Sequence, residues 1–371
     1  MDDNMHELYG EFTKWRDRLL KKVKEHPLEM ITWEITRNCN LNCEHCGSPR
    51  ETWDPNRELE TVEVISLCEK IAKSFDITRL KYINFTGGEP LVRKDILEIF
   101  QVVKDLGFKN ITLTTNGIKL AETPKLLEEI IKRGVTGIGI DVDGTKDIHD
   151  RFRGVKGAFD KAMRCVGLIT NKELKNRLLS TINTVVSQRN INQLEKIWEI
   201  VQKYEPDRWR LIPAIPIGRG SCASFLLQPE QYINMFIFIR KLRASQKIIE
   251  IELGCGDWLG MKLEGQLRSY IWHCASGINT MGIYYDGGVG GCTNIPTTYI
   301  EGNVRTDEIT EVWNNQYKKY RNFDWRKTGQ CIDCNQWEFC HGGPMHRRRE
   351  DGTLSYCVYK DVVHNRVSPK K

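Results

Sequence analysis

Residues 30–48 read MITWEITRNCNLNCEHCGS, a largely apolar segment followed by a segment with three cysteines. Residues 30–36 are largely apolar and β-branched, which predicts a buried strand. Three cysteines, Cys39, Cys43 and Cys46, follow within the next ten residues. The sequence therefore predicts a loop at the end of a buried strand in which three thiols come close together.

Three thiolates at this spacing can hold one corner of an iron–sulfur cubane. Because the motif offers only three cysteines, one iron stays open to an external ligand, as one position stays open in catalytic zinc sites. A zinc knuckle and incidental buried cysteines are the alternatives. Zinc would need a fourth ligand, for which His45 is the local candidate.

Strand and helix patterns alternate beyond this loop. Further strands are predicted at 81–86, 110–115, 137–142, 180–186 and 209–214, and helices at 5–24, 61–75, 95–106, 123–133, 157–170, 190–204 and 229–245. About six β-strand/α-helix units in series predict an α/β fold, a partial (βα)6 barrel with parallel strands inside and helices outside.

Turns that suit a ligand follow two of these strands. Residues 87–90 are Gly87, Gly88, Glu89 and Pro90; two glycines let a ligand approach the backbone, and Glu89 can pair with an amine. Thr115, Asn116 and Gly117 end the next strand. Since ligands in such sheets bind at the carboxyl ends of strands, both turns are expected beside the cysteine loop.

With these motifs, residues 30–219 resemble the radical S-adenosylmethionine (SAM) superfamily. The resemblance implies a catalytic 4Fe–4S cluster on Cys39, Cys43 and Cys46, whose open iron binds the amino and carboxylate groups of SAM. It implies an oxidoreductase or maturase that reductively cleaves SAM to a 5′-deoxyadenosyl radical, which takes a hydrogen atom from a substrate. It also implies SAM contacts from His45, Gly87, Gly88, Glu89, Pro90, Thr115, Asn116, Asp141, Arg153 and Asn183.

A second group of cysteines lies near the C-terminus and resembles the SPASM extension of that superfamily. Its members are Cys274, Cys292, Cys331, Cys334, Cys340 and Cys357. The resemblance implies one auxiliary 4Fe–4S cluster on the last four. A zinc ribbon on the same four thiolates is the alternative.

A second auxiliary cluster is left open by the sequence. Its fourth cysteine would stand at Pro344, so Cys274 and Cys292 remain, and Cys255 is available to join them. Such a site would be completed by a substrate atom, by His341 or by His346, or the cluster would be absent. Thr293 stands where sulfatase maturases carry Asp, which argues against formylglycine formation.

Composition bounds the remaining choices. The chain has 371 residues, 13 cysteines and a net charge of +6. An odd number of clustered cysteines favours metal ligation in a reducing compartment. With no signal peptide and no apolar run long enough for a membrane span, we expect a cytoplasmic protein without a membrane partner. Acids and bases alternate except in the basic tail at 364–371, so no nucleic-acid partner is expected.

The expected organisation is an N-terminal helix at 1–26, the barrel at 27–225, linker helices at 226–253 and the SPASM-like domain at 254–371. A ribosomally synthesised peptide is the leading substrate, modified by crosslinking, epimerisation or oxidation. The alternatives are a small molecule or cofactor, such as a tetrapyrrole or aminoglycoside, and a non-catalytic iron–sulfur or zinc protein. The resemblance also implies an electron donor such as ferredoxin or flavodoxin, and two clusters would bring about eight iron atoms.

Overall fold

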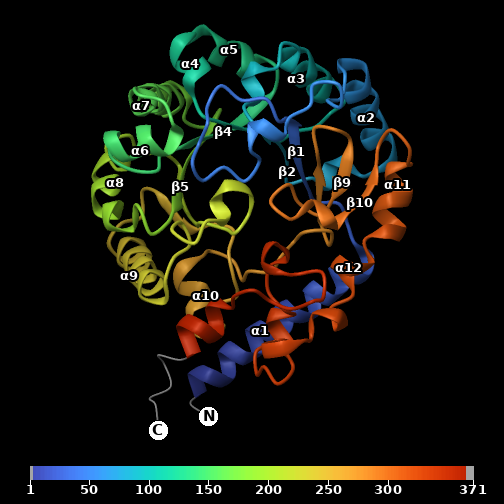
Figure 1. Cartoon of the computed structure of the whole chain (residues 1–371), viewed down its shortest axis with the longest axis vertical. Coiled ribbons are helices and arrows are strands. Elements are labelled where there is room, and N and C mark those ends of the chain that lie inside the picture. The colour runs from blue at the N-terminus through green and yellow to red at the C-terminus, as the bar shows by residue number, and fades with distance from the viewer. Residues whose placement is uncertain (1–2, 365–371) are drawn as a thin grey trace.

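The computed structural model describes residues 3–364, whose strands form one sheet of ten strands (Figure 1). The order is β10-β9-β8-β1-β2-β3-β4-β5-β6-β7. The strands from β8 through β1 to β7 are parallel, whereas β9 and β10 pair antiparallel at the edge. The bounds are β1 Met30–Thr36, β2 Tyr82–Gly87, β3 Ile111–Thr115, β4 Val135–Asp141, β5 Leu179–Val186, β6 Arg208–Pro213, β7 Glu250–Leu253, β8 Thr280–Ile283, β9 Gly288–Gly290 and β10 Ile300–Asn303.

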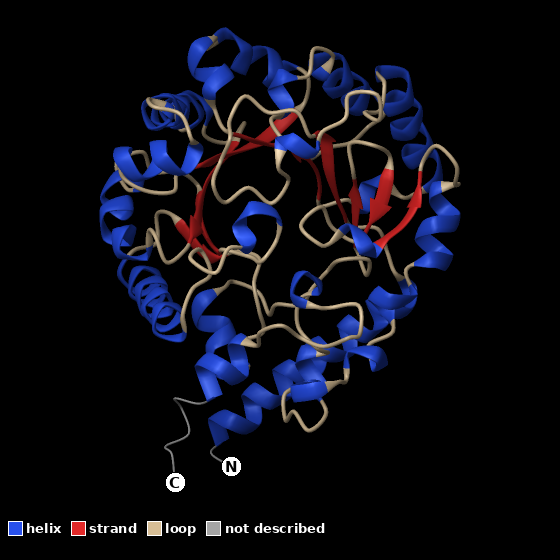
Figure 2. Ribbon diagram, viewed as in Figure 1, coloured by secondary structure: helices blue, strands red, loops and turns tan. Residues whose placement is uncertain are grey.

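Helices surround the curved sheet on its outer side, as the ring of helices around the strands in Figure 2 shows. Helices α2 to α9 follow the strands around this ring (Figure 1). The bounds are α1 Asp3–Glu25, α2 Thr61–Ser74, α3 Ile96–Asp105, α4 Ile118–Glu122, α5 Lys125–Lys132, α6 Lys146–Arg153, α7 Ala158–Ile169, α8 Leu194–Val201, α9 Pro229–Ser245, α10 Met261–Leu267, α11 Ile309–Glu311, α12 Lys318–Arg321 and α13 Trp337–Cys340.

The strands alternate between an apolar outer face and a polar inner face. In β1, Ile31, Trp33 and Ile35 are buried in the core between sheet and helices. Side chains alternate along a strand, so the intervening residues, such as Thr32, point into the barrel lumen. Burying each outer Ile contributes about 1.5–3 kcal/mol. The same alternation in β2 to β7 anchors the sheet to the helices and leaves a polar lumen for function.

The predicted fold class, an α/β barrel with parallel strands, is confirmed, and β1 to β6 lie within two residues of their predicted bounds. The structure extends this sheet further than the sequence indicated. Strand β7 lies at the end of the segment 226–253, for which only helices were expected, and pairs with β6. Strand β8 of the cysteine-rich region pairs with β1. The short helices α4 and α6 were not predicted.

The N-terminal helix α1 packs against the cysteine-rich region, in the lower part of Figure 1. Phe12, Trp15 and Leu19 are buried in a cluster with Trp258. The helix predicted at 5–24 is present as α1, and Leu20 on it is 42% exposed. Aromatic contacts to Phe12 and Trp15 from Trp258 fix the helix to the C-terminal half.

Three smaller expectations concern a membrane span, the basic tail and the cysteines outside the two cysteine groups. Within residues 3–364, no helix is both long and apolar enough to cross a bilayer. The basic tail lies outside the described residues apart from His364. The two helical cysteines expected in the core, Cys68 and Cys165, are indeed buried, whereas Cys222 is exposed.

Glu29 provides a pH-dependent clamp between α1 and the barrel. Its carboxylate lies 2.7 Å from Lys22 Nζ and 3.0 Å from Lys81 Nζ. Burial alone would raise the pKa of Glu29, but these cations and Asn279 lower it to about 2. Because its folded pKa lies below the unfolded value near 4.3, this stabilisation is present above pH 4.3 and is lost as the pH falls toward 2.

We therefore expect Glu29→Gln to unfold at lower urea concentration at pH 7, and the gap from the wild type to narrow as the pH falls from 5 to 3. Urea midpoints across this range measure the effect. Glu25→Gln, which changes an exposed carboxylate 3.8 Å from Lys21, serves as the control and should change little. A gap that is constant with pH would contradict this account.

Candidate active site

The loop that carries Cys39, Cys43 and Cys46 follows β1 and is held by segments from distant strands. Glu44 N donates to Phe152 O at 2.8 Å, from helix α6 after β4. Arg219, after β6, donates from its backbone to Cys46 O and from Nε to Cys43 O, each at 2.9 Å. The carboxyl ends of β1, β4 and β6 thus position the three thiols.

The glycine turn after β2 contacts the same loop without room for any side chain. Gly88 N donates to Thr36 O, and Glu89 N donates to Asn38 O, both at 2.8 Å. A Cβ atom on Gly87 would lie 2.1 Å from Thr36 O, and one on Gly88 would lie 2.1 Å from Asn38 O. These two glycines are therefore required so that the turn can lie against the cysteine loop.

The Glu89 side chain is used inside the protein, which corrects its predicted role as a partner for an amine. Its carboxylate accepts hydrogen bonds from Leu91 N at 3.1 Å, Thr115 Oγ1 at 2.6 Å and Asn116 N at 2.8 Å. It is 1% exposed, and burial raises its pKa. Glu89 thus ties the ends of β2 and β3 together, and only the backbone of the turn remains for a ligand.

Asn116 connects the third strand end to the cysteine loop. Its Nδ2 donates to Asn40 Oδ1 at 2.7 Å, next to Cys39. Pro90 is buried at the start of the turn that follows Glu89. The predicted turns at 87–90 and 115–117 therefore both meet the loop of the three cysteines, as their positions at neighbouring strand ends require.

A buried arginine links the loop to β4. Arg153 Nη1 lies 3.8 Å from Cys43 Sγ, and Nη2 lies 3.2 Å from Asp141 and contacts Asp143 more closely. Burial alone would raise the pKa of Asp143, but the Arg153 guanidinium holds it below its usual value. Asn183 donates to Asp141 Oδ1 at 3.2 Å, while its own buried Oδ1 has no partner.

His45 does not serve as the fourth ligand that a zinc site would need. Its ring packs against Phe152 and Phe225, and its Nε2 lies 3.5 Å from Asp143 Oδ2. Within residues 3–364, no group of three or more His, Cys, Asp or Glu side chains converges on a single-ion site. Thiolates that share one zinc ion would converge closely, since Zn–S bonds are about 2.3 Å.

The three thiols need a cation to act as ligands. Burial raises the pKa of Cys39 to about 12 and also raises the pKa values of Cys43 and Cys46. Metal ligation requires thiolates, and binding of a metal releases their protons. A trio of half-buried thiols therefore fits a group whose iron atoms stabilise the negative sulfurs.

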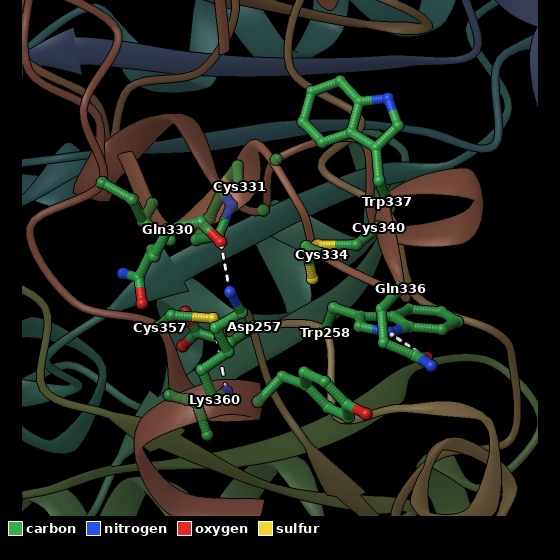
Figure 3. A pocket seen from close by; sticks show the side chains of 16 residues that line it. Asp257, Trp258, Gln330, Cys331, Cys334, Gln336, Trp337, Cys340, Cys357 and Lys360 are labelled. Atoms are coloured by element: carbon green, nitrogen blue, oxygen red, sulfur yellow. Dashed lines mark hydrogen bonds between the residues drawn. The ribbon is translucent and has the colours of Figure 1, made fainter. Parts of the chain in front are cut away.

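A second cysteine group lines a cavity near the C-terminus (Figure 3). Its thiols are Cys331, Cys334, Cys340 and Cys357, the four predicted to hold an auxiliary cluster. Burial, then Cys357, Cys334 and Cys331, raise the pKa of Cys340 well above its usual value. Four thiols around one cavity match the donor set of a cubane, and Pro344 lines the same cavity.

Two buried arginines beside these thiols lack acidic partners among residues 3–364. Arg348 Nη2 donates to Cys331 Sγ at 3.3 Å and otherwise binds carbonyl oxygens. Arg326 is 2% exposed, and burial lowers its pKa to about 10, although nearby Cys274 raises it. Buried cations need a compensating anion. Thiolate-bound clusters, which are negative, would supply that charge.

A third group brings Cys255 together with Cys274 and Cys292. Burial, and then the nearby Cys292 and Cys274, raise the pKa of Cys255 to about 12. Burial likewise raises the pKa of Cys292, to which Cys274 adds. Whether Cys255 joins Cys274 and Cys292 as a cluster ligand stays a prediction. His341 packs against Phe323 with ring centroids 4.6 Å apart, and His346 is buried beside Arg347.

Several site residues were not predicted. Arg219 and Asp143 hold the cysteine loop, and Gly218 lies so close that a Cβ atom would be 2.5 Å from Cys46 O. The Gly218-Arg219-Gly220 sequence at the end of the last predicted strand was an available signal. Asp143 has no local pattern, because its partners Arg153 and His45 come from other segments.

Comparisons with known proteins agree with this geometry. Residues 33–200 match the sequence pattern of the Radical SAM superfamily, and residues 274–335 match SPASM, an iron–sulfur cluster-binding domain. The chain thus contains a radical SAM domain and a SPASM domain. It is an enzyme whose family implies a catalytic 4Fe–4S cluster, SAM and auxiliary iron–sulfur clusters.

Relatives of known name differ in their substrates. The chain is 27% identical over 352 residues to an AdoMet-dependent heme synthase of Methanosarcina barkeri, covering 89% of this chain and 96% of the relative. It is 28% identical over 330 residues to a mycofactocin maturase of Mycolicibacterium smegmatis, covering 85% and 77%. The structure of anSMEcpe with bound AdoMet and a peptide shares the fold, with a TM-score of 0.67, 20% identity and coverage of 90% and 94%.

The hydrogen bonds that the Glu89 carboxylate accepts from Leu91, Thr115 and Asn116 give a prediction about stability. Glu89→Gln replaces one acceptor oxygen by an NH2 group that faces the donors from β3, so we expect about 1–3 kcal/mol of lost stability. Thermal unfolding of the anaerobic protein measures the change. Glu98→Gln, on the exposed side of α3, is the matched control. A Glu89→Gln protein as stable as this control would refute the bracing role.

The three-cysteine group gives a prediction about iron content. If Cys255, Cys274 and Cys292 hold a cluster, the reconstituted protein carries about twelve iron atoms, and Cys255→Ala lowers this by about four. Iron and sulfide analysis after anaerobic reconstitution measures both values. Cys222→Ala, at an exposed cysteine, should leave the content unchanged. About eight iron atoms in wild type and variant alike would show that this group holds no cluster.

Proposed function

We propose that this enzyme cleaves SAM at Cys39, Cys43 and Cys46 and uses the product to remove a hydrogen atom from a substrate in the barrel lumen. The observation that supports it is the meeting of the strand ends of β1, β2, β3, β4 and β6 at one cysteine loop. Gly87, Gly88 and Asn116 contact that loop directly. An electron carrier or a zinc-binding module has no use for a ligand-binding turn at this position.

Different residues would hold the cluster and bind SAM. The bound cluster and SAM supply a radical that can take a hydrogen atom from a nearby C–H bond. Arg153 holds the Cys43 side of the loop and balances its negative charge. The backbone of the turn at 87–90 would receive the amino group of SAM, and the free Oδ1 of Asn183 would accept a hydrogen bond from one of its hydroxyls.

For the substrate, we propose a peptide first, because the spacing of the C-terminal cysteines resembles the SPASM extension found in peptide maturases. A tetrapyrrole is the second candidate, favoured by similarity over 96% of the length of a heme synthase. We further propose a ferredoxin or flavodoxin as electron donor. A cytoplasmic location is supported by the thirteen free cysteines, which suit a reducing compartment.

A cleavage assay tests the proposed chemistry. We expect the reconstituted enzyme with dithionite and SAM to form 5′-deoxyadenosine, and Cys43→Ala to form none above background, because one ligand of the catalytic cluster is lost. Chromatography of the products measures both rates, and Cys222→Ala is the control that keeps wild-type turnover. Cleavage retained by Cys43→Ala would overturn the assignment of the loop.

A further inference from the structure

A row of polar residues crosses four neighbouring strands on the lumen side of the sheet. The register pairs Asp141 of β4 with Asn183 of β5, then with Arg210 of β6 and Glu252 of β7. The residue before each of them is buried in the core between sheet and helices. Because side chains alternate along a strand, all four point into the lumen. Arg210 thus lies one strand beyond Asn183, about 4.8 Å away between backbones.

Arg210 also faces residues from the opposite wall of the barrel. Burial raises the pKa values of Tyr82 and Tyr270, and Arg210 lowers both. Tyr82 belongs to β2, four strands away from β6 in the sheet, so the two can be neighbours only across the lumen. Tyr270 is 46% exposed, so its hydroxyl is accessible to a ligand. Arg210 also lowers the pKa of Cys255, which burial raises.

The guanidinium of Arg210 makes no short ion pair within the described residues, whereas the guanidinium of Arg208 does. Arg208 Nε and Nη2 each lie 2.9 Å from Glu250 Oε2. For Arg210, the nearest carboxylate oxygen within residues 3–364 is Glu252 Oε2, at 3.9 Å from Nε. That distance is longer than a hydrogen bond. The Arg210 side chain remains 36% exposed, so its donors face the lumen.

We propose that Arg210 binds a carboxylate of the substrate in the barrel lumen, between Asn183 on the catalytic side and Cys255 on the auxiliary side. This inference rests on the function proposed above and names the chemical class of its substrate. A planar guanidinium with free donors matches a carboxylate with two hydrogen bonds. Tyr82 and Tyr270 provide hydroxyl groups beside it. The carboxylate belongs to a peptide or to a side chain of a porphyrin.

Binding titrations of the reconstituted protein test this with carboxylate probes and matched neutral probes. In one arm the probe is metal-free coproporphyrin III, compared with its tetraamide by fluorescence. In the other arm it is a mixture of synthetic decapeptides with free C-termini, compared with the same mixture amidated, by ultrafiltration and mass spectrometry. We expect the wild type to bind the carboxylate form at least about tenfold more tightly in one arm, which identifies the source.

Arg210→Gln should abolish this preference, and Arg210→Lys, which keeps the charge without the planar fork, should retain part of it. Arg208→Gln is the matched control and should keep the full preference. A wild type without preference in both arms, or an Arg210→Gln protein that keeps the preference, overturns the proposal.

The failure of this inference can be separated from that of the proposed function. If the wild type forms no 5′-deoxyadenosine, the proposed function fails. The probe titrations still test whether Arg210 binds a carboxylate, because they do not depend on SAM cleavage. If the wild type cleaves SAM normally and shows no carboxylate preference, only the role of Arg210 is refuted. Circular dichroism of each variant establishes that its fold is intact before binding is compared.

Discussion

The close backbone contact between the end of β1 and the turn after β2 is the constraint on which the active site depends. Carbonyl oxygens of Thr36 and Asn38 lie where the Cβ atoms of Gly87 and Gly88 would be. This contact fixes the cysteine loop relative to the ligand-binding turn. Any side chain there would push the two apart, because the colliding atoms are backbone atoms with little freedom to move.

Buried charge is the second organising feature. Arg153 lies among Asp141, Asp143 and the thiol of Cys43, so its positive charge is shared between carboxylates and the cysteine loop. Near the C-terminus, Arg326 and Arg348 have no such carboxylates within the described chain and lie beside cysteines instead. A buried guanidinium is costly without a counter-charge. Both regions therefore suit negatively charged sulfur. Carboxylates accompany the buried arginine at the catalytic loop, whereas none accompanies the two buried arginines near the C-terminus within the described residues.

The division between the two faces of the sheet connects fold and chemistry. Residues such as Trp33 and Trp209 on the outer face secure the strands to the helices. The inner face is then free to carry polar groups that contribute little to packing, including Asn183 and Arg210. Because β1 to β8 form one sheet, these inner residues lie on the same face of it.

The sequence by itself determined what depends on local pattern. Alternating apolar residues located β1 to β6, and the spacing of Cys39, Cys43 and Cys46 indicated the catalytic cluster, because strand periodicity and loop ligation act over a few residues. Only the tertiary structure decided that the Glu89 carboxylate accepts hydrogen bonds from Leu91, Thr115 and Asn116. It also decided that Arg219 holds the backbone of the cysteine loop at Cys43 and Cys46. Most of these contacts join residues far apart in the chain, and they arise from the order in which the strands pair, which no local period encodes.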